Sequence, residues 1–192
     1  MNIIPAVTIS NYDGNKSYDL FSLLLKERII MITGEINDEL ASIVIGEIIY
    51  LNALSPNEKI TMYINSPGGS VSSGLAIYDV MQSVSSPIET IGMGMCASMG
   101  AFLLSSGTKG LRKAYPNCEI MIHQPLGGSN GQVSDLEIMT NRFIYLKNKL
   151  NQILATNTNQ SIEKIIKDTD RNYFMSSKEA LNYQLIDEIK TS

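Results

Sequence analysis

The chain reads IETIGMGMCASMGAFLL from Ile88 to Leu104, and this stretch decides its fold. Residues 88–91 are mostly apolar and β-branched, which is typical of a buried strand. Residues 99–104 are apolar on every side, which indicates a helix buried in the core. Ser98 therefore stands where a strand turns into a helix.

Ser98 has two interpretations at this position. Backbone N–H groups at a helix start have no partner within the helix, and the helix dipole adds positive charge there, so an oxyanion would be stabilised. A serine is also among the commonest residues to cap a helix through its side chain. The glycine spacing differs from the Gly-x-Ser-x-Gly nucleophile elbow, because position 96 is Cys. This stretch alone leaves both interpretations open.

The composition excludes several classes of protein. The chain has 192 residues, enough for one domain, and 18% of them are charged, which suggests that other subunits cover part of its surface. A net charge of −4 without a lysine or arginine cluster argues against nucleic acid as a partner. The single histidine and the two cysteines, Cys96 and Cys118, lack metal-ligand spacing, so we expect no metal site.

The N-terminal sequence shows no targeting signal. Residues 1–7 lack the basic segment of a secretory signal, and no apolar run approaches the roughly 20 residues of a membrane span. We therefore expect a cytoplasmic protein with reduced cysteines and no contact with a membrane.

Strands and helices alternate along most of the chain, and the strands begin roughly every 30 residues, the length of a βαβ unit. This rhythm predicts a mostly parallel sheet with right-handed crossovers. Strands are expected over 28–32, 60–64, 88–91, 119–122 and 185–189, and helices over 17–25, 38–54, 99–104, about 134–156, from 71, from 161 and over 176–183. Residues 1–16 are expected to form a mobile arm or a hairpin outside the core.

The helix over about 134–156 is long for one compact domain. A Ser134-x-x-Glu137 pattern predicts a capping box at its start. An apolar stripe along it favours contact with another subunit, although the stripe could also pack on the protein's own core. Its members are Leu136, Met139, Phe143, Leu146, Leu150 and Ile153.

Three candidate groups follow successive strands. Gly68-Gly69 follow the second strand, Ser98 the third and His123 the fourth. The carboxyl ends of neighbouring parallel strands lie along one edge of a sheet, so Ser98 and His123 can meet. A serine hydroxyl needs a base to become a nucleophile, and neutral imidazole is the usual base near pH 7. A lone histidine is often structural, but its place beside this edge favours catalysis.

Three longer motifs resemble the ClpP family of serine proteases. They are Asn65-Ser66-Pro67-Gly68-Gly69, Ala97-Ser98-Met99-Gly100-Ala101-Phe102-Leu103-Leu104 and Met121-Ile122-His123-Gln124-Pro125-Leu126-Gly127-Gly128. The match is collinear across essentially the whole chain. It implies an α/β fold, the ClpP/crotonase-like spiral of repeated βαβ units with a protruding long handle helix. One protease domain would span 1–192, with a mobile arm over 1–16 and a handle region over about 124–156.

The resemblance also implies site residues. Ser98 would be the nucleophile and His123 the base, with the backbone N–H groups of Gly69 and Met99 as oxyanion donors. The family's triad acid is an aspartate, and here the matching position holds Asn172. An Asn carbonyl can accept the imidazole N–H and hold the ring, but it cannot stabilise the imidazolium with a full charge.

The partners implied by the resemblance are copies of this chain or a ClpP paralogue in two stacked seven-membered rings, a hexameric Clp ATPase, and unfolded polypeptides. ATP would be used by the ATPase, and this chain would bind no cofactor. Asp170-Arg171 resembles the family's ring-to-ring ion pair.

The family's apolar pocket for the ATPase is matched by Tyr63, Ile91, Met93 and Tyr115. At other positions of that pocket the sequence has Thr61, Ser83 and Lys113. A lysine in an apolar pocket is costly unless its charge reaches water, which weakens the expectation that the ATPase docks to this subunit.

Three functions fit the sequence. The first is a serine endopeptidase subunit of an ATP-dependent Clp protease, weak as a homomer, that cuts unfolded polypeptides into short peptides. The second is a structural or regulatory ring subunit that works beside an active ClpP paralogue. The third is a crotonase-like enzyme acting on acyl-CoA, which the fold permits, but Ser98 with His123 argues against it because such enzymes need no activated serine.

Overall fold

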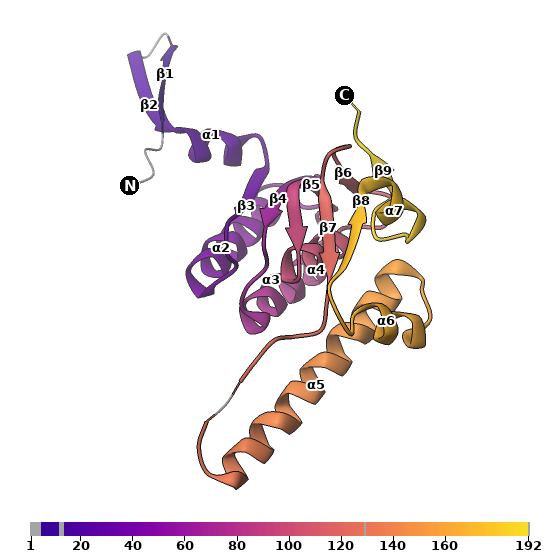
Figure 1. The fold of residues 1–192 in the computed structure, drawn as a ribbon. Helices are drawn as coiled ribbons and strands as arrows, with labels where there is room; N and C mark the ends of the chain where they lie inside the picture. Colours follow the sequence, from indigo (N-terminus) through magenta and orange to yellow (C-terminus); the bar gives the residue numbers. More distant parts are fainter. Residues whose placement is uncertain (1–4, 12–13, 129, 192) are drawn as a thin grey trace.

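A seven-stranded sheet with helices packed against it forms the body of the protein, and a two-stranded hairpin stands apart from it (Figure 1). The computed structural model describes residues 5–11, 14–128 and 130–191. The strands are β1 (Ala6–Asn11), β2 (Gly14–Asp19), β3 (Ile29–Thr33), β4 (Ile60–Ser66), β5 (Ile88–Ala97), β6 (Arg112–Ala114), β7 (Glu119–Ile122), β8 (Tyr173–Ser176) and β9 (Glu188–Ile189). The helices are α1 (Leu20–Lys26), α2 (Asp38–Leu54), α3 (Val71–Ser83), α4 (Met99–Ser105), α5 (Val133–Thr158), α6 (Ile162–Asp168) and α7 (Ser177–Asn182).

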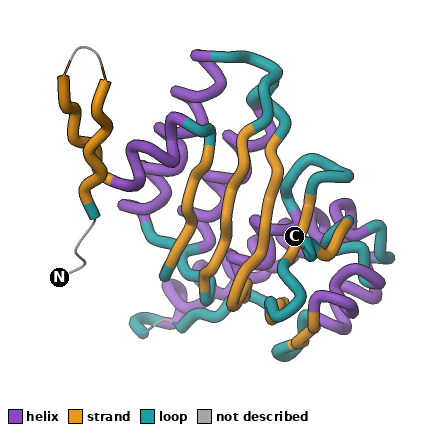
Figure 2. The backbone as a smooth tube through the Cα atoms, turned by 90° about the horizontal axis from the view of Figure 1, so that it is seen from above, coloured by secondary structure: helices purple, strands orange, loops and turns teal. Residues whose placement is uncertain are grey.

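Strand β5 is the centre of the large sheet. It pairs in parallel with β4 along one edge, with β6 through its first half and with β7 through its second half. The parallel order β3-β4-β5-β6-β9 confirms the predicted sheet, and β8 adds one antiparallel strand beside β7. Figure 2 shows these strands side by side, twisted as parallel sheets are. The strand was expected to end at residue 91, but its pairing with β7 extends it to Ala97.

The helices α2, α3 and α4 confirm the predicted alternation. Asn37 caps α2 by accepting a hydrogen bond from Leu40 N at 2.9 Å, and Ser70 caps α3 through Ser73 N. All seven residues of α4 are buried, as its uniformly apolar sequence requires. Fully buried side chains from β3, β4, α3 and α4 join in one core, including Ile32, Ile64, Ile77 and Leu103.

The N-terminal segment forms a hairpin, one of its two expected forms. Strands β1 and β2 pair in an antiparallel register from Ala6↔Asp19 to Asn11↔Gly14, and the hairpin projects from the body in both views (Figures 1 and 2). The helix predicted over 17–25 begins later, at Leu20, because Asp19 caps it by accepting from Ser22 N at 3.0 Å. Residues 1–4, 12 and 13 of the predicted arm lie outside the described residues.

The C-terminal half of helix α5 packs on the body of the protein, and its N-terminal half projects well beyond that body (Figure 1). Its buried residues, Leu150, Asn151, Leu154 and Thr158, all lie in the C-terminal half. The predicted capping box at Ser134 is wrong: Gln132 occupies the cap position, and no side chain bonds to the exposed backbone there. No helix among the described residues has the length and apolar character needed to cross a membrane.

The C-terminal third holds two short helices and two short strands. The caps predicted at Ser161 and Ser176 are confirmed, and Ser176 with Glu179 forms a complete capping box. The final strand is shorter than expected, because residues 185–186 are buried in the core and only Glu188–Ile189 pair with β6. Strands β6 and β8 were not expected from the sequence.

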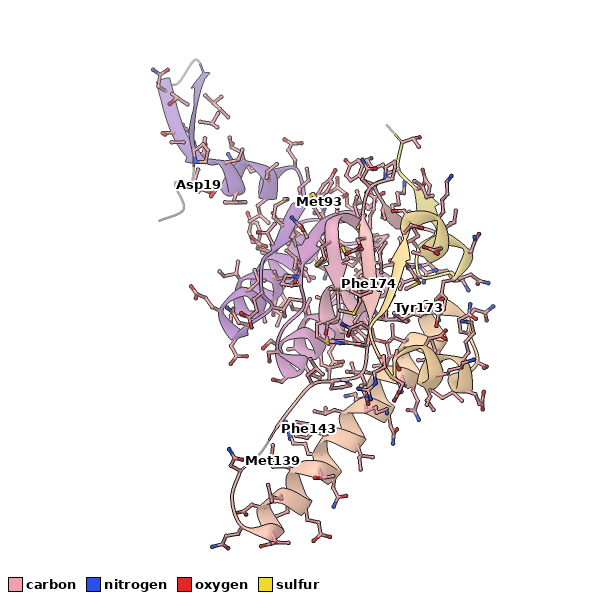
Figure 3. All side chains as sticks on the ribbon, in the orientation of Figure 1. Asp19, Met93, Met139, Phe143, Tyr173 and Phe174 are labelled. Atoms are coloured by element: carbon pink, nitrogen blue, oxygen red, sulfur yellow. The ribbon has the colours of Figure 1, made fainter. Side chains whose placement is uncertain are left out.

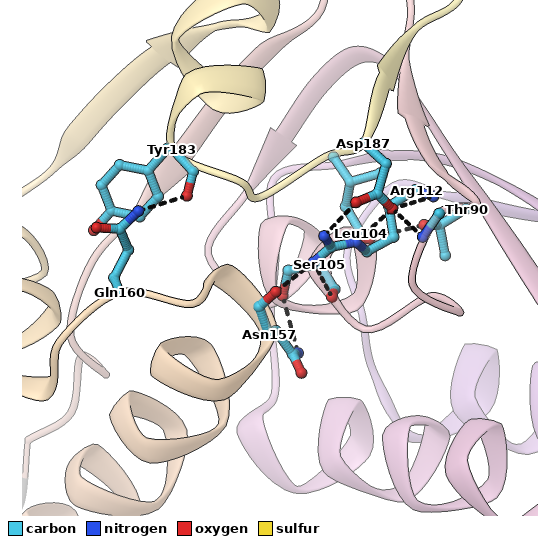
Figure 4. A network of polar contacts seen from close by, with 9 residues as sticks. Thr90, Leu104, Ser105, Arg112, Asn157, Gln160, Tyr183 and Asp187 are labelled. Carbon is cyan, nitrogen blue, oxygen red and sulfur yellow. Dashed lines mark hydrogen bonds and ion pairs between the residues drawn. The ribbon is translucent and has the colours of Figure 1, made fainter.

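A buried ion pair ties this C-terminal third to the sheet (Figure 4). Arg112 Nε donates to Asp187 Oδ2 at 2.8 Å, and Arg112 Nη1 donates to the carbonyl oxygen of Asn157. The Arg112 side chain is 3% exposed. Burial raises the pKa of Asp187, but the hydrogen bonds and charge of Arg112 outweigh burial and lower that pKa below its ordinary value. The pair therefore stabilises the fold only while Asp187 is ionised.

Replacing Asp187 by Asn should lower the free energy of unfolding by about 3 kcal/mol at pH 7, because the buried guanidinium loses its counter-charge. Urea unfolding at fixed protein concentration measures the loss. The loss should shrink below about pH 4, since acid protonates Asp187 as pH falls through its lowered pKa. Asp79→Asn, an exposed carboxylate on α3, is the matched control. An equal midpoint for the two variants at pH 7 would contradict the assigned role.

Candidate active site

Ser98 lies at a strained turn between β5 and α4. Its backbone angles are φ 53° and ψ −120°, a region that non-glycine residues rarely adopt. It occupies the cap position of α4, but its side chain makes no capping hydrogen bond. The interpretation of Ser98 as a helix cap therefore lacks the interaction that defines a cap, and the hydroxyl is available for another partner.

Gly68 and Gly69 pack between Ser98 and the end of β3. A Cβ atom on Gly68 would lie 2.6 Å from Ser98 Cβ, and one on Gly69 would lie 2.1 Å from the carbonyl oxygen of Ile36. Both glycines have positive φ angles. Ile36 N donates to Gly68 O at 2.8 Å and Ser70 N donates to Ile36 O at 2.7 Å, so the loop is fixed on both sides. Glycine is required here because any side chain would displace Ser98 or Ile36.

The backbone N–H groups of Gly69 and Met99 are the two predicted oxyanion donors. Met99 is the first residue of α4, where an N–H has no partner within the helix. Among the hydrogen bonds of the described residues, none uses the N–H of Met99 or Gly69. Met99 follows Ser98 directly, and Gly69 lines the same cavity as Ser98, so their role as oxyanion donors stays a prediction.

His123 follows β7 and lies beside Ser98. Ser98 N donates to Met121 O at 2.8 Å, which joins the start of α4 to β7 two residues before the histidine. His123 and Ser98 line the same cavity, of about 340 Å³. Ser98 and His123 thus follow the neighbouring strands β5 and β7 and line one cavity.

Asn172 lies against the far side of the imidazole. Its Oδ1 is 3.0 Å from His123 Nδ1, so the amide oxygen can accept a hydrogen bond from the N–H at that nitrogen. Strand β8 positions Asn172, since Tyr173 pairs with Ile122 directly before the histidine. Gln124 N also donates to Thr169 O at 2.6 Å. Because Nδ1 faces Asn172, Nε2 is the imidazole nitrogen that remains for another partner.

A small apolar pocket of about 20 Å³ adjoins Ser98 and His123 on the side of the core, and it was not expected from the sequence. Its lining comes from four elements that are distant in sequence, namely α3, α4, β7 and α5. The apolar residues are Val71, Met99, Phe102, Ile122, Leu150 and Leu154. Of the two residues from α5, Leu150 belongs to the predicted apolar stripe and Leu154 does not.

Asp170 and Arg171 are the predicted ring-to-ring pair, and both are exposed. Their side chains are 61% and 92% exposed, and Arg171 Nε lies 3.8 Å from Asp170 Oδ2. Gln124 Nε2 donates to the carbonyl oxygen of Asp170 at 2.8 Å, so this pair is joined to the residue after His123. Their role in assembly stays a prediction.

The predicted docking residues occupy neighbouring strands of the sheet. Tyr63 pairs with Ile91 across β4 and β5, while Met93 lies in the middle of β5 and Tyr115 directly follows β6. Ile91 is buried, so it is not a contact surface in the single chain. Burial, followed by the neighbouring Tyr115 and Glu89, raises the pKa of Tyr63.

Lys113 is paired on the same sheet. Its Nζ lies 2.9 Å from Glu188 and 3.4 Å from Glu89, which is itself 3.0 Å from Lys59. The hydrogen bond and charge of Glu188, with those of Glu89, outweigh burial and raise the pKa of Lys113. The two carboxylates thus offset the desolvation cost of a lysine at this place. The charged groups also make this part of the surface less apolar.

Cys96, in β5, and Cys118, directly before β7, are buried free thiols. Their sulfur atoms are 3.9 Å apart, and the absence of a side chain on Gly92 leaves room for both. The proximity of Cys118 and burial raise the pKa of the Cys96 thiol, which keeps it protonated. Protonated buried thiols are packing groups and not nucleophiles.

The fold and the site together define a class: an α/β protein whose serine, at a strand–helix turn, lies beside a histidine at the end of the next strand. The family model described as Clp protease matches residues 12–192. The chain therefore belongs to the Clp protease family, which confirms the resemblance and the fold class. Clp proteases are ClpP-type peptidases that assemble into rings and work with Clp ATPases.

Replacing Gly68 by Ala should slow labelling of Ser98 by a fluorophosphonate about 100-fold, because the new Cβ displaces the serine by a fraction of an ångström or more. Gly110→Ala is the matched control. Its φ of +89° is close to the +98° of Gly68, but no heavy atom lies within 4 Å of its added Cβ. Both variants should lose about 1 kcal/mol of stability from the positive φ. Equal labelling rates, measured by mass spectrometry, would show that the contact with Ser98 is unimportant.

Proposed function

We propose that this chain is the serine peptidase subunit of an ATP-dependent Clp protease, with Asn172 in the place of the usual triad aspartate. The observation that carries the proposal is the strained Ser98, which makes no cap bond and lies beside His123. A backbone held at a costly angle is typical of a serine aimed at a substrate. Family membership supports a peptidase, and the geometry supports these residues within it.

The proposed reaction is acyl transfer. Ser98 Oγ attacks the carbonyl carbon of the scissile peptide bond while Nε2 of His123 takes its proton. The N–H groups of Gly69 and Met99 stabilise the negative oxygen that forms. His123 then returns the proton to the leaving amine, and water releases the acyl group by the same steps in reverse. The chemistry needs neither a metal nor a cofactor in this chain.

Asn172 limits this reaction in the proposed mechanism. Its oxygen can orient the imidazole, but it carries no charge to stabilise the imidazolium. Asn172 is also exposed in the single chain, so water competes for its hydrogen bond to His123. Neighbouring subunits that cover this region would strengthen the bond.

The proposed assembly is two stacked seven-membered rings, of this chain alone or with a ClpP paralogue, in the cytoplasm. Half of the predicted stripe on α5 is covered within the chain, since Leu146, Leu150 and Ile153 pack on the core. Phe143 packs on Gly127, in the segment between β7 and α5. Figure 3 shows Phe143 and Met139 on the side of the helix that faces this segment. The free apolar residues of the projecting half are Val133, Ile138, Ile144 and Tyr145. We propose that this second set meets the opposite ring.

The alternative, a structural or regulatory ring subunit, is favoured by one observation. The uncharged and exposed Asn172 gives His123 weak support in an isolated chain. Peptidase activity of the purified chain, measured alone and after mixing with a ClpP paralogue, distinguishes the two functions.

A fluorophosphonate should label Ser98, and Ser98→Ala should abolish the labelling. Because the Ser98 side chain caps nothing, this variant should keep the urea midpoint of the wild type. Ser161→Ala is the control, since Ser161 accepts from Lys164 N at 3.2 Å and its loss should cost about 1 kcal/mol without changing the labelling. Label on another serine with Ser98 unmodified refutes the assignment.

Asn172→Asp should raise kcat for a fluorogenic peptide. In serine proteases that carry the acid, exchange for Asn lowers kcat by about 10⁴, or about 5.5 kcal/mol of barrier, which sets the upper limit of the gain. Asn182→Asp, at an exposed position of α7, controls for the added charge. If the Asn172 variant assembles normally by gel filtration yet cuts no faster, the acid position does not limit this subunit.

A further inference from the structure

Glu35 lies in the cavity that holds the candidate nucleophile. The cavity of about 340 Å³ is lined by Glu35, Gly68, Gly69, Ser98, His123 and Leu126, together with apolar neighbours. Glu35 is the one carboxylate of this lining, and no lysine or arginine belongs to it. A substrate bound in front of Ser98 therefore meets a single fixed negative charge.

The backbone around Glu35 is held in place from both sides. Gly34 N donates to Asn65 O at 3.0 Å, and Ile36 N donates to Gly68 O at 2.8 Å. Ile36 is fully buried, and its backbone pairs with Gly69 as a short parallel bridge. Glu35 thus has a fixed position relative to the loop that carries the predicted oxyanion donor.

The side chain of Glu35 has no partner of its own in the described part of the chain. None of the ion pairs or side-chain hydrogen bonds there involves its carboxylate, and the residue is exposed. By contrast, Glu89 and Asp187 are both satisfied by basic side chains. The Glu35 carboxylate is free to pair with a cation brought by the substrate.

The space on the other side of the same serine is much smaller. Val71, Phe102, Ile122, Leu150 and Leu154 enclose only about 20 Å³ there, which is too small for a substrate side chain, whereas the Glu35 cavity of about 340 Å³ has room for one. A side chain of a substrate bound in front of Ser98 would therefore enter the space that holds Glu35.

Resting on the proposed function, we propose that Glu35 makes this subunit prefer polypeptides with a lysine or arginine side chain close to the bond that is cut. An ion pair at a solvent-accessible site contributes up to about fivefold in affinity, and we expect a preference of that size. The preference would belong to one substrate position, the one whose side chain enters the Glu35 cavity.

The test measures covalent labelling of Ser98, so it does not require efficient turnover. Two sets of N-acetylated peptidyl fluorophosphonates differ only in one side chain, lysine or the neutral acetyl-lysine, placed at one position at a time. Mass spectrometry of the assembled full-length protein gives the labelling rate for each. The N-acetyl cap removes the α-amino group as an alternative cation.

The ratio of lysine to acetyl-lysine rates should be about five at one position for the wild type and near one for Glu35→Gln. Glu35→Lys should invert it. Glu39→Gln, which removes an exposed carboxylate outside the cavity, should leave the ratio unchanged. Labelling of Ser98 with no charge preference, or with a preference that Glu35→Gln retains, overturns the inference alone. No labelling of Ser98 by any probe overturns the proposed function and this inference with it.

Discussion

The site depends on one constraint: the backbone at Gly68 and Gly69 lies so close to its neighbours that neither residue has room for a side chain. Ile36 lies against one side of this loop and Ser98 against the other, both nearer than a side chain would allow. The segments that follow strands β3, β4 and β5 therefore lie in direct contact with one another. The strained angle of Ser98 persists because these contacts and the bond from Ser98 N to Met121 O leave it no relaxed alternative.

Much of the fold follows from the sequence because its main elements have strong apolar patterns. Helix α2 runs from Asp38 to Leu54 as predicted, with a polar cap in front and an apolar stripe behind. Strand β6 could not be predicted, since its Arg112 and Lys113 are charged and form ion pairs with Asp187 and Glu188 from the far end of the chain. The box at Ser134 failed because several polar residues compete to start α5, and a local pattern cannot choose among them.

The candidate site likewise has residues that the sequence predicts and residues that it does not. Ser98 and His123 follow neighbouring parallel strands, so strand order alone brings them together. Asn172 directly precedes an antiparallel strand that no periodicity predicts, and only the resemblance pointed to this residue. Glu35 had no signal at all, since its place depends on the bridge between Ile36 and Gly69. Backbone contacts between loops are set by tertiary packing, which a single sequence does not display.

The stability of the projecting half of α5 would depend, by mass action, on the concentration of a partner that binds to it. A helix that leaves the body keeps too few buried side chains to be stable alone, because isolated helices of about 12–15 residues are marginal in water. A partner subunit that covers the exposed Ile138, Ile144 and Tyr145 would bind the folded form and not the unfolded one. The folded fraction of this segment then rises with the concentration of its partner. Dilution would destabilise the helix. Because the chain runs directly from His123 to this helix, the histidine would be held less firmly as well.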